Sequence, residues 1–187
     1  MKKGIPPNAK RMFKGQVFEV WQWEQKVFDG TTEIYEKISR PDSADVIAVV
    51  GDKILIEEQE QPHRAPFVSI PGGRCNEGEE ASTGAKRELL EETGYVSDDW
   101  TMFRERKPFN SLEWTVYTFI ARDCKHIQDP HLDAGERITI KPVSFDEFLE
   151  LSQRPDFRDK ELALYLLRTQ FDPEFKKELK EKIFGHK

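Results

Sequence analysis

The chain has 187 residues, of which 37% are hydrophobic and 34% are charged, and its formal net charge is −6. This length suits one domain with an appended element, and the 13 Phe, 4 Trp and 4 Tyr allow a sizeable core. The composition provides no basic surface for nucleic acid, so we expect no nucleic-acid partner. The longest apolar run, residues 46–50, is far too short to span a membrane.

The cysteines and the start of the chain indicate the compartment. Cys75 and Cys124 are the only two cysteines, which is too few for a disulfide framework in a chain of this length. We therefore expect a reducing, cytoplasmic location. Residues 1–14 are basic but contain no apolar segment of the kind that signal peptides carry.

Residues 1–42 are predicted to form an N-terminal β-element. Residues 1–15 should be an extended lead-in. Two runs of strand composition, residues 17–27 and 31–38, lie on either side of an Asp-Gly pair. An Asp-Gly pair between two such runs is a strong hairpin signal.

Trp21 and Trp23 lie two residues apart in the first of these strands, so both side chains point to the same side of it. In one interpretation they pack against a neighbouring sheet or a second subunit. In the other they form a stacking platform for a nucleobase.

Residues 43–152 are expected to form the main domain. Its strands are predicted at residues 45–50, 53–57, 67–70, 95–106 with a turn around 97–99, 113–121 and 137–141. Pro142 should end the last of them, and the polar stretch 58–66 should be a loop. Within that loop, Arg64 is either a phosphate ligand, because a guanidinium presents paired donors, or a surface arginine that contacts no phosphate.

Four helices are predicted. An acidic helix starts near Glu79 or Glu80 and ends at Thr93-Gly94, where glycine is a good C-terminal cap. The others cover residues 145–151, 159–169 and 174–184. The last two make up a C-terminal helical extension, residues 153–187.

The acidic helix carries Arg87, Glu88, Glu91 and Glu92. Glu88 and Glu92 are four residues apart and lie on one face of the helix, and Glu91 lies close to that face. Three carboxylates within one turn repel each other unless a cation compensates. Mg²⁺ or Mn²⁺ meets that need because hard divalent ions prefer oxygen ligands. Arg87 lies four residues before Glu91 and can pair with it.

A solvated acidic helix would carry a similar run of charges, so the wider spacing decides between the two interpretations. That spacing resembles the Nudix box, Gly-x5-Glu-x7-Arg-Glu-U-x-Glu-Glu-x-Gly-U, in which U is bulky and apolar. The run from Gly73 to Tyr95 matches the pattern at every defined position.

The resemblance covers roughly residues 45–151. It implies an α/β fold, namely a Nudix α/β/α sandwich with a mixed β-sheet, here with an N-terminal β-hairpin element and C-terminal helices. It also implies metal-dependent hydrolysis of a small-molecule nucleotide substrate, a nucleoside diphosphate linked to another moiety.

The resemblance also implies roles for individual residues of the box. Glu88 and Glu92 correspond to the family's usual metal ligands, and Glu91 to a further ligand or a base. Gly73 or its neighbour would offer a backbone carbonyl to the metal, and Arg87 would orient the glutamates.

Further features resemble the branch of ADP-ribose and nucleotide-sugar pyrophosphatases. In that branch an N-terminal β-element often crosses to a partner subunit, which implies a homodimer. Arg64 precedes the Pro-Gly-Gly turn, and Pro108 lies near where the branch carries a proline. Both residues, with Trp21 and Trp23, are assigned to substrate binding.

The same branch takes its general base from a loop before the last core strand. The matching residue here is Glu136, and Asp133 is the nearby substitute. An exposed loop carboxylate with no catalytic role is the alternative interpretation of Glu136.

Other functions stay open on the sequence. One is hydrolysis of dinucleoside polyphosphates or capped RNA ends, and the acidic balance disfavours RNA. Another is isomerisation of an isoprenoid diphosphate, which would require a cysteine such as Cys75 in the active-site cleft. The last is a non-catalytic sensor that binds a nucleotide, against which the intact glutamates argue.

Overall fold

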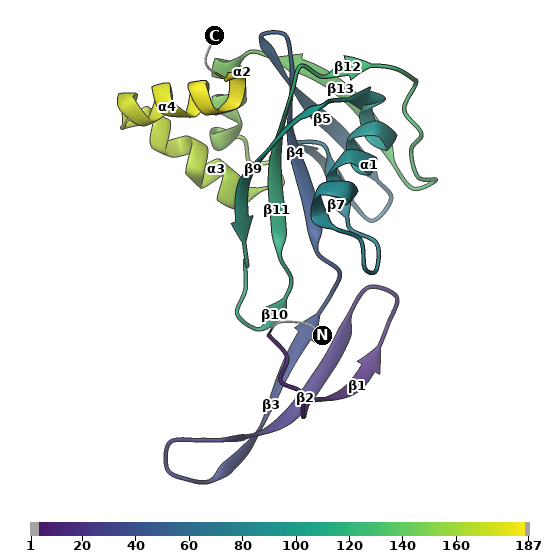
Figure 1. Cartoon of the computed structure of the whole chain (residues 1–187), viewed down its shortest axis with the longest axis vertical. Coiled ribbons are helices and arrows are strands. Elements are labelled where there is room, and N and C mark those ends of the chain that lie inside the picture. The colour runs from purple at the N-terminus through teal and green to yellow at the C-terminus, as the bar shows by residue number, and fades with distance from the viewer. Residues whose placement is uncertain (1–3, 186–187) are drawn as a thin grey trace.

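The computed structural model describes residues 4–185, and Figure 1 shows a main domain with a β-sheet protruding from one end. The strands are β1 (Lys10–Lys14), β2 (Glu19–Lys26), β3 (Thr32–Ser39), β4 (Ser43–Val50), β5 (Lys53–Gln61), β6 (Arg64–Ser69), β7 (Gly72–Arg74), β8 (Tyr95–Val96), β9 (Asp99–Arg106), β10 (Leu112–Glu113), β11 (Val116–Arg122), β12 (Lys125–His126) and β13 (Arg137–Val143). The helices are α1 (Ala81–Thr93), α2 (Phe145–Glu150), α3 (Lys160–Leu167) and α4 (Pro173–Phe184), with short 3₁₀ turns η1 (Leu151–Gln153) and η2 (Arg168–Gln170).

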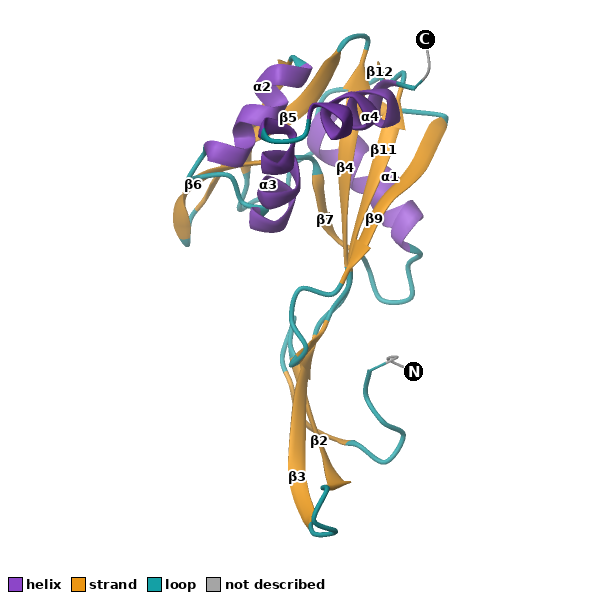
Figure 2. Ribbon diagram, turned by 90° about the vertical axis from the view of Figure 1, so that its left-hand side faces the viewer, coloured by secondary structure: helices purple, strands orange, loops and turns teal. Residues whose placement is uncertain are grey.

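The main sheet has seven strands in the order β13-β5-β4-β11-β9, with β6 paired to β5 and β7 paired to β4. It is mixed, because β11 runs parallel to β4 while its other neighbour, β9, is antiparallel to it. Helix α1 covers one face, and α2, α3 and α4 cover the other (Figure 2). The predicted α/β/α sandwich with a mixed β-sheet is confirmed.

Alternating side chains of β4 explain why both faces are covered. Ile47 and Val49 belong to the core under α2–α4, whereas Val46 and Ala48 belong to the core under α1. Successive side chains of a strand point to opposite faces, so a strand that is apolar throughout must be covered twice.

Helix α1 begins and ends close to the predicted positions. Ala85 and Leu89 are fully buried and hold it against the sheet. Gly94 ends it in the left-handed region, with φ 73°, and its N–H donates to the carbonyl of Leu90. This is the conformation that favours glycine after a helix.

The C-terminal helices share a core with the sheet. Phe148, Leu166, Leu179 and Ile183 are buried in the same cluster as strand residues such as Ile47. The apolar stripe of α4, Phe175, Leu179 and Ile183, is buried, and α2 begins with a capping box formed by Ser144 and Glu147. None of the helices in the described part of the chain is long and apolar enough to cross a membrane.

The protruding sheet has the order β1-β2-β3-β10. The predicted hairpin is confirmed, with β2 and β3 paired antiparallel from Glu19↔Ser39 to Lys26↔Thr32. Residues 10–14, expected to be only a lead-in, form β1 on the free edge of β2. Residues 1–3 of that lead-in lie outside the described residues.

Two other predictions within the main domain were wrong. Residues 58–66 are not a loop, because β5 continues to Gln61 and β6 starts at Arg64. Most of these residues are exposed, as their polarity suggests, but Gln59 is buried and donates to Glu57 and Ser69. Pro142 does not end β13 but pairs with Leu55. It is tolerated because β13 is an edge strand, where a missing N–H leaves no partner unsatisfied.

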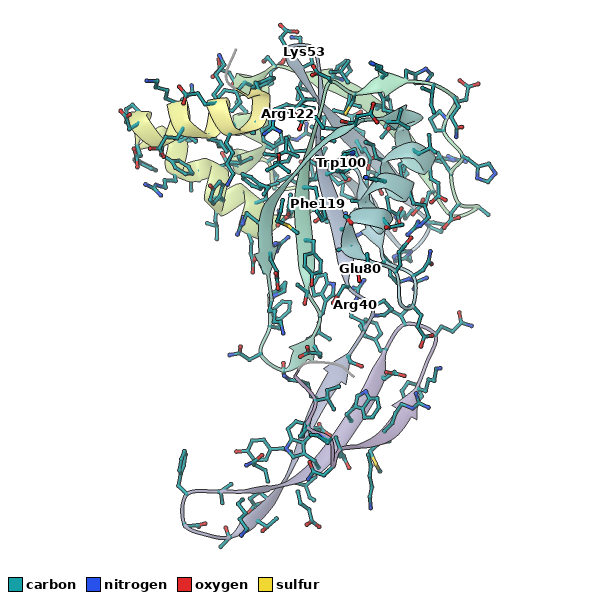
Figure 3. All side chains as sticks on the ribbon, viewed as in Figure 1. Arg40, Lys53, Glu80, Trp100, Phe119 and Arg122 are labelled. Atoms are coloured by element: carbon teal, nitrogen blue, oxygen red, sulfur yellow. The ribbon has the colours of Figure 1, made fainter. Side chains whose placement is uncertain are left out.

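The strand predicted at residues 113–121 is divided between the two sheets. Its main part is β11, whereas Leu112–Glu113 pairs with β3 of the protruding sheet. Strand β10 and the chain between β3 and β4 therefore connect the two sheets. Figure 3 labels Arg40 at this junction, and its guanidinium lies 4.6 Å from the ring centroid of Trp114.

Candidate active site

The loop between β7 and α1 is tied to the helix by Arg87. This side chain donates from Nε and Nη2 to the carboxylate of Glu79, at 3.1 and 3.0 Å, and from Nη2 to the carbonyl of Arg74 at 3.0 Å. Glu79 also accepts the backbone N–H of Asn76 at 2.7 Å. The hydrogen bond from Arg87 is the main reason that the pKa of Glu79 is lowered, so this carboxylate is held ionised in a structural role.

The same guanidinium orients two glutamates of α1. Its Nη1 lies 2.9 Å from Oε1 of Glu88 and 2.9 Å from Oε2 of Glu91. The predicted pairing of Arg87 with Glu91 is confirmed. A guanidinium is suited to this arrangement because its donors form a rigid fork that serves several carboxylates together.

The two glycines before the box place backbone directly against Glu88 and Glu92. The amide of Gly72 donates to Oε2 of Glu92 at 2.6 Å. A Cβ added at Gly73 would lie 2.5 Å from the carboxyl carbon of Glu88. Gly72 has a φ of 145° and approaches the carbonyl of Ala44, which leaves no room for a side chain. Glycine is required at position 72 by the backbone, whereas a side chain at position 73 would displace the carboxylate of Glu88.

Glu57 of β5 lies beside Glu92 in the interior, and the two residues are 0% and 6% exposed. Burial raises the pKa of Glu57 to about 7. Burial, and then the neighbouring charge of Glu57, raise the pKa of Glu92 well above its usual value. Two buried carboxylates side by side disfavour ionisation of both, because each charge is desolvated and opposed by the other.

The two carboxylate oxygens of Glu57 differ in their hydrogen bonding. Its Oε2 accepts from Nε2 of Gln59 at 2.6 Å and from Oγ of Ser69 at 3.3 Å. Its Oε1 is buried and has no hydrogen-bond partner within residues 4–185. Leaving a buried acceptor unsatisfied is unfavourable, so this oxygen is a candidate ligand for a cation.

Glu136 is brought to the same site by the loop that precedes β13. That loop is anchored on the C-terminal end of α1, because the amide of His131 donates to the carbonyl of Glu91 at 2.7 Å. Oε1 of Glu136 accepts from Nε2 of Gln61 at 3.4 Å. Burial, and then Asp133, raise the pKa of Glu136. Its charge in turn contributes to the raised pKa of Glu88, for which burial is the main cause.

Arg64 begins β6 and is exposed, on the same side of the sheet as Gln61. Its Nη2 donates to Oε1 of Gln61 at 2.8 Å, and its guanidinium lies 3.6 Å from the ring centroid of Phe67. Arg64 therefore lies near Glu136, because the side chain of Gln61 is hydrogen-bonded to both residues.

Trp21, Trp23 and Pro108 are not part of this cluster. Trp21 donates to Oγ of Ser39 at 3.1 Å, and Trp23 lies 6.2 Å from Tyr35 between ring centroids, so both belong to the protruding sheet. Pro108 lies between β9 and β10 in the connection to that sheet. Within the described chain, these three residues contact none of the site carboxylates.

The donor set suits Mg²⁺ or Mn²⁺. The buried or half-buried donors are all oxygens, from Glu57, Glu88 and Glu92. Burial is the main cause of their raised pKa values, and a bound cation would offset that cost of ionisation. In the part of the chain that the structure describes, no three acidic, thiol or imidazole groups are gathered as a complete ligand set. Water and substrate phosphates would therefore have to complete the coordination of an ion bound here.

A glycine turn that leads into a glutamate-rich helix, set against a mixed sheet, is the arrangement that the Nudix box predicts. Residues 39–165 match the family described as NUDIX domain, so the chain belongs to this family. The assignment to a Nudix hydrolase is confirmed.

Individual relatives agree with this assignment. A protein of Bacillus subtilis (strain 168) named ADP-ribose pyrophosphatase is 26% identical over 160 residues, which cover 82% of this chain and 85% of the relative. The methanol dehydrogenase activator of Bacillus methanolicus is 24% identical over 170 residues, which cover 87% of this chain and 91% of the relative. A solved structure, described as that of an ADP compounds hydrolase, has a TM-score of 0.70 at 20% identity and covers 88% of this chain and 92% of its own. The predicted likeness to the ADP-ribose pyrophosphatase branch is confirmed.

The sequence did not point to Glu57 or Asp45. Asp45 directly precedes the apolar residues 46–50 and Glu57 directly follows the apolar residues 54–56, and both are less than 9% exposed. Burial raises the pKa of Asp45 to about 6. An acidic residue adjoining an apolar strand run is the signal that would have identified them, because such residues are rarely buried without a reason.

Proposed function

We propose that this Nudix hydrolase uses Mg²⁺ or Mn²⁺ to cleave the diphosphate of ADP-ribose or a related nucleotide sugar, giving a nucleoside monophosphate and a sugar phosphate. The observation that carries the proposal is the cluster of Glu57, Glu88 and Glu92 against the Gly72-Gly73 backbone. The relative named ADP-ribose pyrophosphatase supports the choice of substrate.

Each residue of the site is assigned a role in metal binding, positioning or phosphate binding. Glu88 and Glu92, with Glu57 and the carbonyl of Gly73, would hold the metal, which would supply charge that screens a diphosphate and makes water more acidic. Arg87 holds Glu88 and Glu91 in place. Arg64 binds phosphate oxygens as charge moves to the leaving group.

Proton transfer is assigned to Glu136. Its carboxylate is half-buried at the rim of the site, and burial raises its pKa, which makes it a better acceptor of a proton from water. Glu91 of the box, tied to Arg87, is the alternative base. Replacing each by Gln and comparing the loss of turnover distinguishes them, because only the base is needed for the proton-transfer step.

Among the other functions, isomerisation loses support. Cys75 is buried, and burial raises the pKa of its thiol to about 11, so it is poorly suited to act as an acid or nucleophile in a cleft. Hydrolysis of dinucleoside polyphosphates stays open, because it uses the same groups on a longer phosphate chain.

We also propose that the protein is a homodimer that pairs through the protruding sheet. Its exposed apolar side chains include Phe13, Ile34 and Ile38, which the strand pairing places on one face of the sheet. An exposed apolar face of this kind often marks an interaction site. Trp21 and Trp23 would serve this interface or a substrate base bound beside it. A cytoplasmic location stays a prediction, and the free thiols of Cys75 and Cys124 fit it.

A hydrolysis screen tests the proposal. Purified protein with Mg²⁺ or Mn²⁺ is offered ADP-ribose, several nucleotide sugars, NADH, a diadenosine polyphosphate and a nucleoside triphosphate, and products are identified by mass spectrometry. We expect one nucleotide sugar to yield a nucleoside monophosphate and a sugar phosphate. Preferred cleavage of the diadenosine polyphosphate would replace the proposal with its alternative, and nucleotide binding without any product would indicate a sensor.

A further inference from the structure

The segment that links η1 to α3 is paired to the edge of the main sheet. The amide of Val68 donates to the carbonyl of Asp156 at 2.9 Å, and the amide of Arg158 donates to the carbonyl of Val68 at 2.8 Å. Val68 and Phe157 form a parallel bridge. This segment is therefore positioned by backbone hydrogen bonds to β6, as an added strand would be.

The side chain of Arg158 lies within electrostatic reach of the site carboxylates. Its charge opposes the rise that burial causes in the pKa values of Glu57, Glu92 and Glu136. Nη2 of Arg158 lies 3.8 Å from Oδ1 of the buried Asp45.

Arg158 and Arg64 lie on either side of Phe67. Their guanidinium carbons are 5.6 and 3.6 Å from the centroid of the Phe67 ring. An open pocket of about 480 Å³ lies here, lined by both arginines, Phe67, Lys160 and Asp156 among others. Asp156 is paired with Arg154, so the three remaining cations favour an anionic ligand.

The donors of this pair are largely unused. Within the described residues the Arg158 side chain, 34% exposed, makes no hydrogen bond, and Arg64 uses only Nη2. Burial, and then the charge of Arg158, lower the pKa of Arg64, so the two cations are close enough to repel each other. A bound anion would remove that repulsion and use the free N–H groups of both.

We propose that Arg158 is a substrate-binding residue that, together with Arg64, clamps the diphosphate of the nucleotide substrate. The inference rests on the proposed function, since it takes the phosphates to lie between this pair and the carboxylate cluster. It gives the C-terminal region a direct part in the site. The competing role for Arg158 is structural, as the cation that faces the buried Asp45.

The test uses the full chain, Mg²⁺ and an analogue of ADP-ribose in which a methylene group replaces the bridging oxygen. Calorimetry gives its dissociation constant, and a thermal melt checks folding. Arg158→Gln should weaken binding by roughly 10- to 100-fold, as expected for losing hydrogen bonds to a charged group. Arg154→Gln is the matched control, because Arg154 lies in the same segment but pairs with Asp156, and it should change binding by less than about twofold.

A second variant separates the two roles. Asp45→Asn combined with Arg158→Gln removes the buried charge that Arg158 faces. If the clamp is correct, the double variant binds as weakly as Arg158→Gln alone. Binding restored to the wild-type value, or a single Arg158 variant that binds within about twofold of wild type, would overturn the clamp while leaving the proposed function in place. A wild-type protein that does not bind the analogue would overturn both.

Discussion

The main domain and the protruding sheet are stabilised in different ways. In the main sheet, strand β4 is almost entirely buried, and residues such as Val46 and Ile47 are 0% exposed. In the protruding sheet, Phe28, Ile34 and Met12 are 112%, 62% and 59% exposed. The first region buries its apolar side chains within the chain, and the second does not.

The difference shows which region leaves apolar side chains exposed when the chain is alone. Seven of the twelve large hydrophobic residues that are exposed in the described chain lie between Met12 and Ile38. Covering exposed apolar surface removes it from water, so a concentration of such residues often marks a surface of association. We therefore expect changes in the main domain to act within one chain and changes in the protruding sheet to act on association.

The largest effect is expected in the buried carboxylate cluster of the main domain. Glu92→Gln keeps the shape of the side chain but removes its charge, so turnover of the substrate found in the screen should fall by roughly 100-fold or more. Glu80→Gln, an exposed position before the same helix, is the control and should retain activity. Near wild-type turnover in Glu92→Gln, measured with an unchanged melting temperature, would remove Glu92 from the metal site.

The second prediction compares one truncation in each region. Leu89→Ala empties a fully buried position under α1 and should lower the free energy of unfolding by about 2–5 kcal/mol. Ile34→Ala, in the protruding sheet, should lower it by less than about 1 kcal/mol at low protein concentration. Urea denaturation measures both, and equal effects would mean that the protruding sheet is as well packed as the main one.

The third prediction concerns the pH dependence of stability that Asp45 causes. Its folded-state pKa of about 6 lies above the ordinary value of 3.8, so the folded state binds the proton more tightly. The stability contributed by this group is present at pH 4 and is lost as the pH rises through 6. Asp45→Asn should therefore gain roughly 1–3 kcal/mol relative to wild type between pH 4 and pH 7. Denaturation curves that shift equally at both pH values would contradict this.

The smallest effect is expected at the surface of the protruding sheet. Ile34→Glu places a charge in the proposed dimer interface and should raise the dissociation constant of the dimer by about 10-fold or more. Leu164→Glu is the matched control, since Leu164 is 68% exposed on α3 of the main domain. Sedimentation over a range of concentrations measures both. A wild-type protein that is monomeric throughout would refute the dimer.

Much of the site followed from spacing along one helix. Glu88, Glu91 and Glu92 share a helical face, and Arg87 pairs with Glu91 as the four-residue interval requires. The ends of α1 and the hairpin of β2 and β3 were also predictable, because glycine caps and turn residues act on their immediate neighbours. The polar composition of residues 58–66 led to the wrong prediction of a loop. Gln59 in this stretch is buried in a strand and donates to the carboxylate of Glu57.

What the sequence by itself determined, then, is the set of groups whose distances are fixed by local backbone geometry. The tertiary structure decided which distant residues join them. Glu57 reaches Glu92 through the register of β5, and Arg158 faces Asp45 because its segment pairs with β6. Strand register sends alternate side chains to opposite faces, and the raised pKa values arise from burial. Neither is contained in the spacing of residues along the chain.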